Sequence, residues 1–193
     1  MAFALAYIIY QANKGEGALP IPFWNTIWWI LLTFNSLVLS FSVFNSDFQA
    51  SKTYYMGLMN AQQFVAYIFI RQLLVQLLVV VLCICILGIL FPLKGNYSLS
   101  NLLFASAVGV FSLSASTLIG GLIGSKTVEG GLLTLILSLP FCIPTIIFGC
   151  RSTKAVLDDL DPIFFFESLL PLCGFSLLPL ALVLILYPSL WKN

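Results

Sequence analysis

Long apolar segments alternate with short polar ones along the chain, and this pattern predicts membrane-spanning helices. No charge occurs between Glu16 and Asp47, and four later charge-free stretches are also long. About 20 mostly apolar residues form a helix that crosses the roughly 30 Å of hydrocarbon in a bilayer. The sequence therefore predicts an all-α polytopic membrane protein. The predicted spans are about 1–12, 23–44, 72–91, 99–123, 131–150 and 168–190.

The first predicted span is too short to cross a bilayer by itself. Its core, FALAYIIY, follows no basic segment and precedes no A-x-A-like cleavage site, which argues against a signal peptide. We therefore interpret residues 1–12 as the outer part of a helix whose beginning is missing from this chain. The predicted fold is one permease domain over 1–193. It is a bundle of six transmembrane helices, the first one truncated, with short amphipathic helices at the membrane surface.

The second and fifth spans carry residues that shape a membrane helix. Trp24, Trp28 and Trp29 are typical of the membrane–water interface, where the indole ring is buried and its N–H stays hydrated. Pro140 and Pro144 each remove a backbone N–H donor and crowd the preceding turn, so a helix kink is expected there.

Two polar segments predict amphipathic helices outside the lipid core. In residues 45–63, Tyr55, Leu58 and Met59 follow the i, i+3, i+4 spacing of one helix side. This helix either lies on the membrane alone or presents its outer face to a soluble partner, and the residues leave both interpretations open. Residues 152–166 separate apolar from charged positions, which predicts a helix on the membrane surface. Its aspartates are interpreted as a solvated face, with a cation site as the alternative.

Composition agrees with a membrane protein but does not orient the chain. Hydrophobic residues make up 61% of the 193 residues and charged residues 8%, whereas soluble domains are about 25% charged. The Lys and Arg residues divide equally between the two sets of alternate loops. The positive-inside rule therefore predicts no orientation.

Few groups suited to catalysis or metal binding are present. The chain has no histidine, and its five cysteines lack the C-x-x-C spacing of zinc and redox motifs. We therefore expect no metal site and no haem ligand of the usual histidine kind. The spans carry no clustered carboxylates, which disfavours a membrane-embedded enzyme. Without a G-x-x-x-x-G-K-[ST] loop the chain has no predicted nucleotide site, and no nucleic-acid partner is expected.

The fourth span is rich in small residues at helix-packing spacings. These residues are Gly109, Ser112, Ser116, Gly120 and Gly124. Small residues four positions apart let two helix backbones approach closely in lipid. They predict helix packing inside the subunit, with a seam between two subunits as the alternative.

Three segments resemble one family of permeases. They are FNSDFQASKTYYMGLMN after the second span, SLSASTLIGGLIGSKTVEGGLLTLILSLPFCIPTIIFG across the fourth and fifth spans, and the ending YPSLWKN. They are similar to the CcmB family, the membrane (permease) subunit of the cytochrome c maturation haem exporter, an ABC-2-type membrane protein. The ending resembles a Bacteroidetes-like branch. The family begins with a basic amphipathic segment that this chain lacks, and Asn60-Ala61 stands where it often has Ser-Pro.

The resemblance implies that residues 45–63 form a cytoplasmic coupling segment, which docks on a separate ABC ATP-binding subunit that uses the ATP. Asp47 stands where the family has an acidic residue, and Lys52 stands near its basic one. The implied coupling residues are Asp47, Lys52, Tyr54, Tyr55, Leu58 and Met59.

Further expectations follow from the same resemblance. Haem is the substrate that the complex transports or transfers, while this chain is expected to bind no cofactor of its own. A homodimer, a second haem-handling membrane protein as partner and the bacterial inner membrane are implied, with residues 152–166 on the extracytoplasmic side. The alternatives are an ABC permease for another substrate, such as a lipid or drug, and a membrane scaffold without transport.

Overall fold

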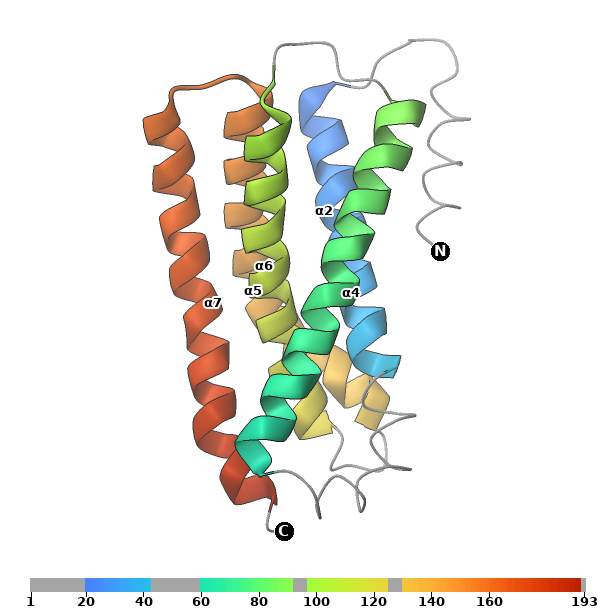
Figure 1. Cartoon of the computed structure of the whole chain (residues 1–193), viewed down its shortest axis with the longest axis vertical. Coiled ribbons are helices and arrows are strands. Elements are labelled where there is room, and N and C mark those ends of the chain that lie inside the picture. Colours follow the sequence, from blue (N-terminus) through green and yellow to red (C-terminus); the bar gives the residue numbers. More distant parts are fainter. Residues whose placement is uncertain (1–19, 43–59, 92–96, 125–129, 192–193) are drawn as a thin grey trace.

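The computed structural model describes residues 20–42, 60–91, 97–124 and 130–191, which form five helices (Figure 1). The helices are α2 (Ile21–Ser42), α4 (Ala61–Leu90), α5 (Leu99–Gly124), α6 (Gly130–Leu157) and α7 (Pro162–Trp191). No strand occurs among the described residues. The predicted all-α class is therefore confirmed.

Four of these helices are long and apolar enough to cross a membrane, over residues 62–90, 99–124, 132–157 and 162–185. The predicted count of six spans is therefore wrong for the part of the chain that the structure describes. The predicted span 1–12 lies outside the described residues. The span predicted at 23–44 is helix α2, whose 22 residues include tryptophan, asparagine, serine and threonine that lower its hydropathy. Most of these polar side chains are buried against neighbouring helices.

Helix α4 begins well before the span predicted at 72–91. The backbone N–H of Asn60 donates to Oε1 of Gln63 at 3.2 Å, and Phe64 N–H donates to the Asn60 carbonyl at 3.0 Å. This cap satisfies groups that the first helical turn would otherwise leave without partners. The last four residues of the predicted coupling segment, 60–63, are thus the cap and first turn of α4. The rest of that segment, 45–59, lies outside the described residues.

The separate amphipathic helix predicted at 152–166 is wrong. Helix α6 continues to Leu157, and α7 begins at Pro162. Between them Asp159 has a φ of 51°, and the Leu160 N–H donates to the Ala155 carbonyl at 3.0 Å. A left-handed residue followed by such a bond ends a helix, and proline is favoured at a first helical position. The chain therefore turns here, and α6 and α7 run in opposite directions.

The two prolines of the fifth predicted span lie inside a continuous helix. Pro140 and Pro144 both belong to α6, which runs without interruption from Gly130 to Leu157. Near them the carbonyl of Phe141 accepts the hydroxyl groups of Thr145, at 3.1 Å, and Ser116, at 3.4 Å. The kink at these prolines stays a prediction.

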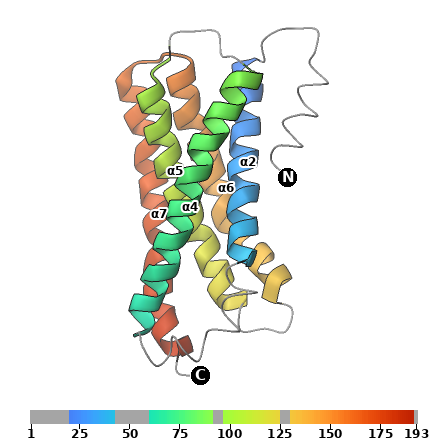
Figure 2. The same ribbon diagram turned by 45° about the vertical axis from the view of Figure 1, so that its right-hand side comes forward.

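Helix α5 lies at the centre of the bundle and contacts the other four helices (Figures 1 and 2). In the apolar stretch of α5 that is long enough to cross a membrane, 72% of the residues are buried. The corresponding share is 22% to 28% in the other three candidate spans. Helix α4 crosses the bundle obliquely, near α7 at one end and α2 at the other. The outer helices therefore bury one face against their neighbours and leave apolar side chains for lipid.

The two ends of the bundle are distinct. Helix α2 ends and α4 begins at the same end, where α5 and α7 also finish (Figure 1). The opposite end holds the end of α4, the start of α5 and the α6–α7 turn. Both helix ends that flank residues 43–59 in the sequence therefore lie at one end of the bundle.

Candidate functional site

The buried polar side chains of the bundle form the candidate site, since lipid-facing surfaces offer almost no polar groups. In hydrocarbon a polar group without a partner is costly, so polar side chains in the spans are expected to face the protein interior. The structure gathers them in three clusters. They join α2 to α6, α2 to α4 and α5, and α5 to α6.

The first cluster, here called the Trp29 cluster, joins α2 to α6. It consists of Asn25, Trp29, Gly109, Gly149 and Thr153. The Trp29 indole N–H donates to Thr153 Oγ1 at 2.8 Å, and the Thr153 hydroxyl donates to Asn25 Oδ1 at 2.5 Å. The amide of Asn25 also donates to the Cys150 carbonyl at 2.7 Å. All three polar side chains are buried, so the bonds hold α2 and α6 in one register.

Two glycines make room for the ring of Trp29. A methyl group at Gly109 of α5 or at Gly149 of α6 would collide with the six-membered ring of this indole. Glycine therefore permits the close approach at both positions. Trp24, Trp28 and Trp29 were expected at the membrane–water interface, but they are only 3%, 0% and 0% exposed. Their rings pack against other helices rather than against lipid headgroups.

The second cluster, here called the polar seam, joins α4 to α2 and α5. It consists of Asn35, Ser36, Ser40, Gln72, Gln76, Ser114 and Thr117. The amide of Gln72 donates to Thr117 Oγ1 at 2.6 Å, and the amide of Gln76 donates to the Leu32 carbonyl at 3.1 Å. Asn35 Nδ2 donates to Gln76 Oε1 at 3.1 Å. The hydroxyl of Ser36 lies 3.3 Å from that of Thr117.

Two atoms of the polar seam have no partner. Within the described residues, Gln72 Oε1 and Ser114 Oγ are buried without a hydrogen bond. Gln72 is 1% exposed and Ser114 is 0% exposed, so neither atom reaches the surroundings of the bundle. A partly satisfied buried network is costly. Its unpaired atoms mark a place where a ligand can bind or where the helices can adopt another arrangement.

The third cluster joins α5 to α6 through the small residues predicted for helix packing. The hydroxyls of Ser112 and Thr145 lie 2.9 Å apart, and that of Ser116 donates to the Ser112 carbonyl at 2.8 Å. A methyl group at Gly120 would collide with Ser138 and the Thr134 carbonyl oxygen of α6. All five predicted residues, Gly109, Ser112, Ser116, Gly120 and Gly124, are buried within this single chain. Their positions favour packing inside the subunit over a seam between subunits.

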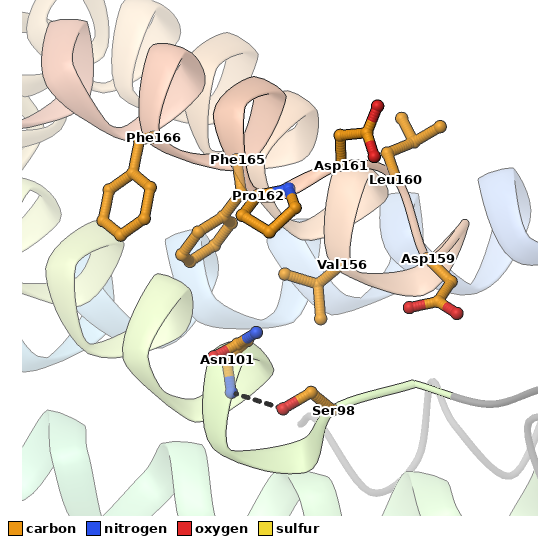
Figure 3. A pocket seen from close by; sticks show the side chains of 9 residues that line it. All are labelled: Ser98, Asn101, Val156, Asp159, Leu160, Asp161, Pro162, Phe165 and Phe166. Carbon is orange, nitrogen blue, oxygen red and sulfur yellow. Dashed lines mark hydrogen bonds between the residues drawn. The ribbon is translucent and has the colours of Figure 1, made fainter.

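An open cleft lies where α6 turns into α7 (Figure 3). Its volume is about 280 Å³, and its walls come from the start of α5, the turn and the start of α7. Figure 3 shows Asp159 and Asp161 at the turn, with Phe165 on α7 and Asn101 on α5 nearby. The two aspartates are exposed, so the cleft resembles a solvated rim more than an enclosed ligand site.

A lateral groove of about 450 Å³ lies between α4, α5 and α7. Its lining is apolar apart from Cys173 and Ser176, and the Ser176 hydroxyl donates to the Cys173 carbonyl at 2.6 Å. The groove lies near the middle of all three candidate spans. On α4 and on α7 its outermost residues lie four residues apart, about 6 Å along the axis. A groove of this kind accommodates a hydrocarbon chain or a single large side chain.

The predicted coupling residues cannot be placed, because Asp47, Lys52, Tyr54, Tyr55, Leu58 and Met59 lie outside the described residues. Within the described ranges, no group of three or more His, Cys, Asp or Glu residues could hold a metal ion. Sequence reasoning missed Gln72, Gln76 and the Trp29 cluster. The signal for the glutamines was present: two of them lie four residues apart, on one helix face, inside an otherwise apolar span.

Comparison with known proteins places the chain in a family. No curated protein and no solved structure matches it. The model of the CcmB protein family matches residues 22–186, from the start of α2 to the later part of α7. The match includes all three polar clusters and extends over most of the chain, which therefore belongs to the CcmB family.

Proposed function

We propose that this protein is the membrane subunit of an ABC-type haem exporter in c-type cytochrome biogenesis. It couples ATP hydrolysis by a separate subunit to the transfer or release of haem. The family match over residues 22–186 carries this proposal, because CcmB proteins are the membrane components of such an exporter. A multi-pass chain with four membrane-capable helices fits that role.

The partner subunit supplies the energy. The sequence has no phosphate-binding loop of the G-x-x-x-x-G-K-[ST] type, so ATP is bound elsewhere in the complex. Residues 45–59 dock on the ATP-binding subunit, and the flanking helices support this proposal because α2 ends and α4 begins on the same side of the bundle. ATP binding moves α2 and α4 because the partner subunit contacts two arrangements of these helices differently.

The remaining members of the complex follow from the family. They are a second copy of this chain, a second haem-handling membrane protein and the lipid of the bacterial inner membrane. This chain has no histidine, the usual axial ligand of haem iron in proteins. The protein therefore moves or releases haem, while another subunit stores it.

The coupling role predicts the effect of a charge reversal. Replacing Asp47→Lys together with Lys52→Glu inverts both charges of the docking segment and leaves the spans unchanged. We expect normal membrane insertion, loss of coupled ATP hydrolysis and loss of mature c-type cytochromes. Cytochrome content is measured by haem staining of membrane proteins, and Asp158→Lys at the exposed α6–α7 turn is the control. Normal cytochrome levels in the double variant would exclude the coupling role.

One observation favours a second function, an ABC permease for a lipid or another apolar compound. The lateral groove between α4, α5 and α7 is apolar and lies near the middle of the spans, where lipid tails are the surrounding solvent. A strain without the protein separates the two functions. Normal c-type cytochromes together with an altered lipid distribution would support the lipid permease, and lost cytochromes would support the haem exporter.

A further inference from the structure

Helix α4 is held to the bundle along one narrow face. Only 22% of the residues in its membrane-length window are buried, and its outer faces expose large apolar side chains such as Leu74, Leu78 and Leu82. Lipid tails are as apolar as these side chains, so no hydrophobic force presses such a helix onto its neighbours. The position of α4 along the bundle therefore depends on the contacts of its inward face, which combine the polar seam with buried apolar residues such as Phe64, Val80 and Leu87.

The polar contacts of that face repeat at intervals of one turn. Gln72 and Gln76 lie four residues apart on α4, and their partners on α2 and α5 lie at two levels. The upper level holds the Leu32 carbonyl, which accepts from Gln76, and the lower level holds Thr117 and Ser36. Four residues along a helix correspond to about 6 Å. A displacement of α4 by one turn would therefore bring one glutamine to the level that the other now occupies.

Two buried hydrogen-bonding groups without partners among the described residues lie about one helical turn from the present contacts. Both lie toward the same end of the bundle. Ser114 precedes Thr117 by one turn on α5, and its buried hydroxyl has no partner among the described residues. Trp28 precedes Leu32 by one turn on α2, and its buried indole N–H has none either. Both lie toward the end of the bundle at which α4 finishes. The unpaired acceptor of the same seam, Gln72 Oε1, belongs to α4 itself.

We propose that α4 has a second position, about one turn further toward its C-terminal end, and that the transport cycle moves it between the two. In this second position Gln72 takes the place of Gln76 beside the Leu32 carbonyl, and the Ser114 hydroxyl donates to Gln72 Oε1. Gln76 comes level with Trp28, whose indole N–H donates to Gln76 Oε1. Thr117 loses Gln72 and keeps its bond to the Leu113 carbonyl, which is 3.0 Å long. The shift thus pairs three atoms that are unpaired in the present position, whereas Gln76 Nε2 gives up the Leu32 carbonyl and Asn35 Nδ2 gives up Gln76 Oε1.

The rest of the bundle provides a fixed frame for this movement. The Trp29 cluster fixes α2 to α6, and the contacts at Gly120 and Ser112 fix α5 to α6. Helix α4 begins at Ala61, within the predicted coupling segment 45–63, so a push on its first turn acts along the helix axis. One-turn displacements of one packed element past another are known in switching proteins. The drive by ATP rests on the proposed function, whereas the two positions rest on the contacts alone.

Disulfide trapping in membranes tests the two positions. In a chain whose five native cysteines are replaced by alanine, Leu32→Cys is combined with one of three α4 substitutions. A disulfide needs Cα atoms within about 7 Å, so each pair reports one register of α4. We expect Gln76→Cys to crosslink in the present position and Gln72→Cys to crosslink in the shifted one. Ile68→Cys lies one further turn away and is the control, in which no crosslink is expected.

The outcomes separate this proposal from the proposed function. A disulfide traps a transient position irreversibly, so the Gln72→Cys pair accumulates even in the chain alone, and faster with the ATP-binding subunit and ATP. Accumulation that ATP does not accelerate would keep the two positions and contradict the ATP coupling. A crosslink only at Gln76→Cys under every condition would overturn the two positions. So would normal cytochrome maturation by a chain that is fully locked through that pair.

A second measurement leaves the buried residues untouched. Spin labels at the exposed Leu82 of α4 and Ile185 of α7, which lie at different levels of the bundle, report the movement of α4, and labels at Ile136 of α6 and Ile185 are the control pair. We expect two populations for the first pair, related by an axial displacement of α4 of about 6 Å, and one population for the control. A single population for the first pair, with and without ATP, would overturn the proposal.

Discussion

At the scale of single residues, Trp29 connects three helices. Its N–H is bonded to Thr153 of α6, and its ring lies against Gly109 of α5 and Gly149 of α6. A buried aromatic ring between two glycines cannot shift without opening a cavity, and its N–H cannot lose its partner without a desolvation cost. The Trp29 cluster therefore stabilises the bundle by packing, and its hydrogen bonds fix the orientation of α2 against α6.

The glycine contacts predict a sharp difference between two alanine substitutions. Gly149→Ala places a methyl group in the ring of Trp29 and is expected to lower the free energy of unfolding by about 1 to 3 kcal/mol. Gly174→Ala is the matched control, since nothing lies within 4 Å of a methyl group there. Reversible unfolding of the purified protein in detergent measures both. Equal stability of the two variants would contradict the close approach of Trp29.

The hydrogen bonds of the same cluster predict the effect of removing one hydroxyl. Thr153→Val leaves the Trp29 N–H and Asn25 Oδ1 buried without their partner, which is expected to cost about 1 to 3 kcal/mol of stability. Thr26→Val is the control, because its exposed hydroxyl bonds only to the Pro22 carbonyl of its own helix. The same unfolding experiment measures both variants. A cost at Thr26 as large as that at Thr153 would argue against the cluster.

At the scale of helices, the sequence predicted the middle of each described helix better than its ends. Charge-free apolar runs define the lipid-spanning part, and the span predicted at 99–123 is nearly the whole of α5. The early start of α4 depends on the bond between Asn60 and Gln63, which hydropathy does not detect. The predicted surface helix at 152–166 failed because the chain turns at Asp159 in the middle of the segment, and Leu160, Ile163 and Phe164 of its predicted apolar face are exposed. Val156, Leu157 and Phe165 are all buried.

The turn between α6 and α7 predicts opposite effects for two substitutions at one position. Asp159 has a φ of 51°, a conformation that glycine adopts freely and a β-branched residue adopts at a cost. We expect Asp159→Gly to keep or slightly raise stability and Asp159→Val to lower it by about 1 to 2 kcal/mol. Melting temperatures of the two variants in detergent test this. A valine variant as stable as the glycine variant would contradict the turn.

At the scale of the whole molecule, composition alone predicted a multi-pass helical protein, and the resemblance predicted its family. The polar seam could not be predicted in the same way. Gln72 and Gln76 read as minor interruptions of an apolar run, and only the fold shows that both amides meet partners on α2 and α5. The sequence thus defines which residues avoid lipid, whereas the three-dimensional packing defines which helices they connect.

The central claim is that this chain works as the membrane subunit of a haem exporter with a separate ATP-binding partner. The most direct measurement is a pull-down of the tagged chain from its native membrane in mild detergent, with the partners identified by mass spectrometry. We predict recovery of an ABC ATP-binding subunit together with a second haem-handling membrane protein. An ATP-binding subunit alone would contradict the haem assignment. Recovery of the chain by itself, with its fold intact, would contradict the account of its function.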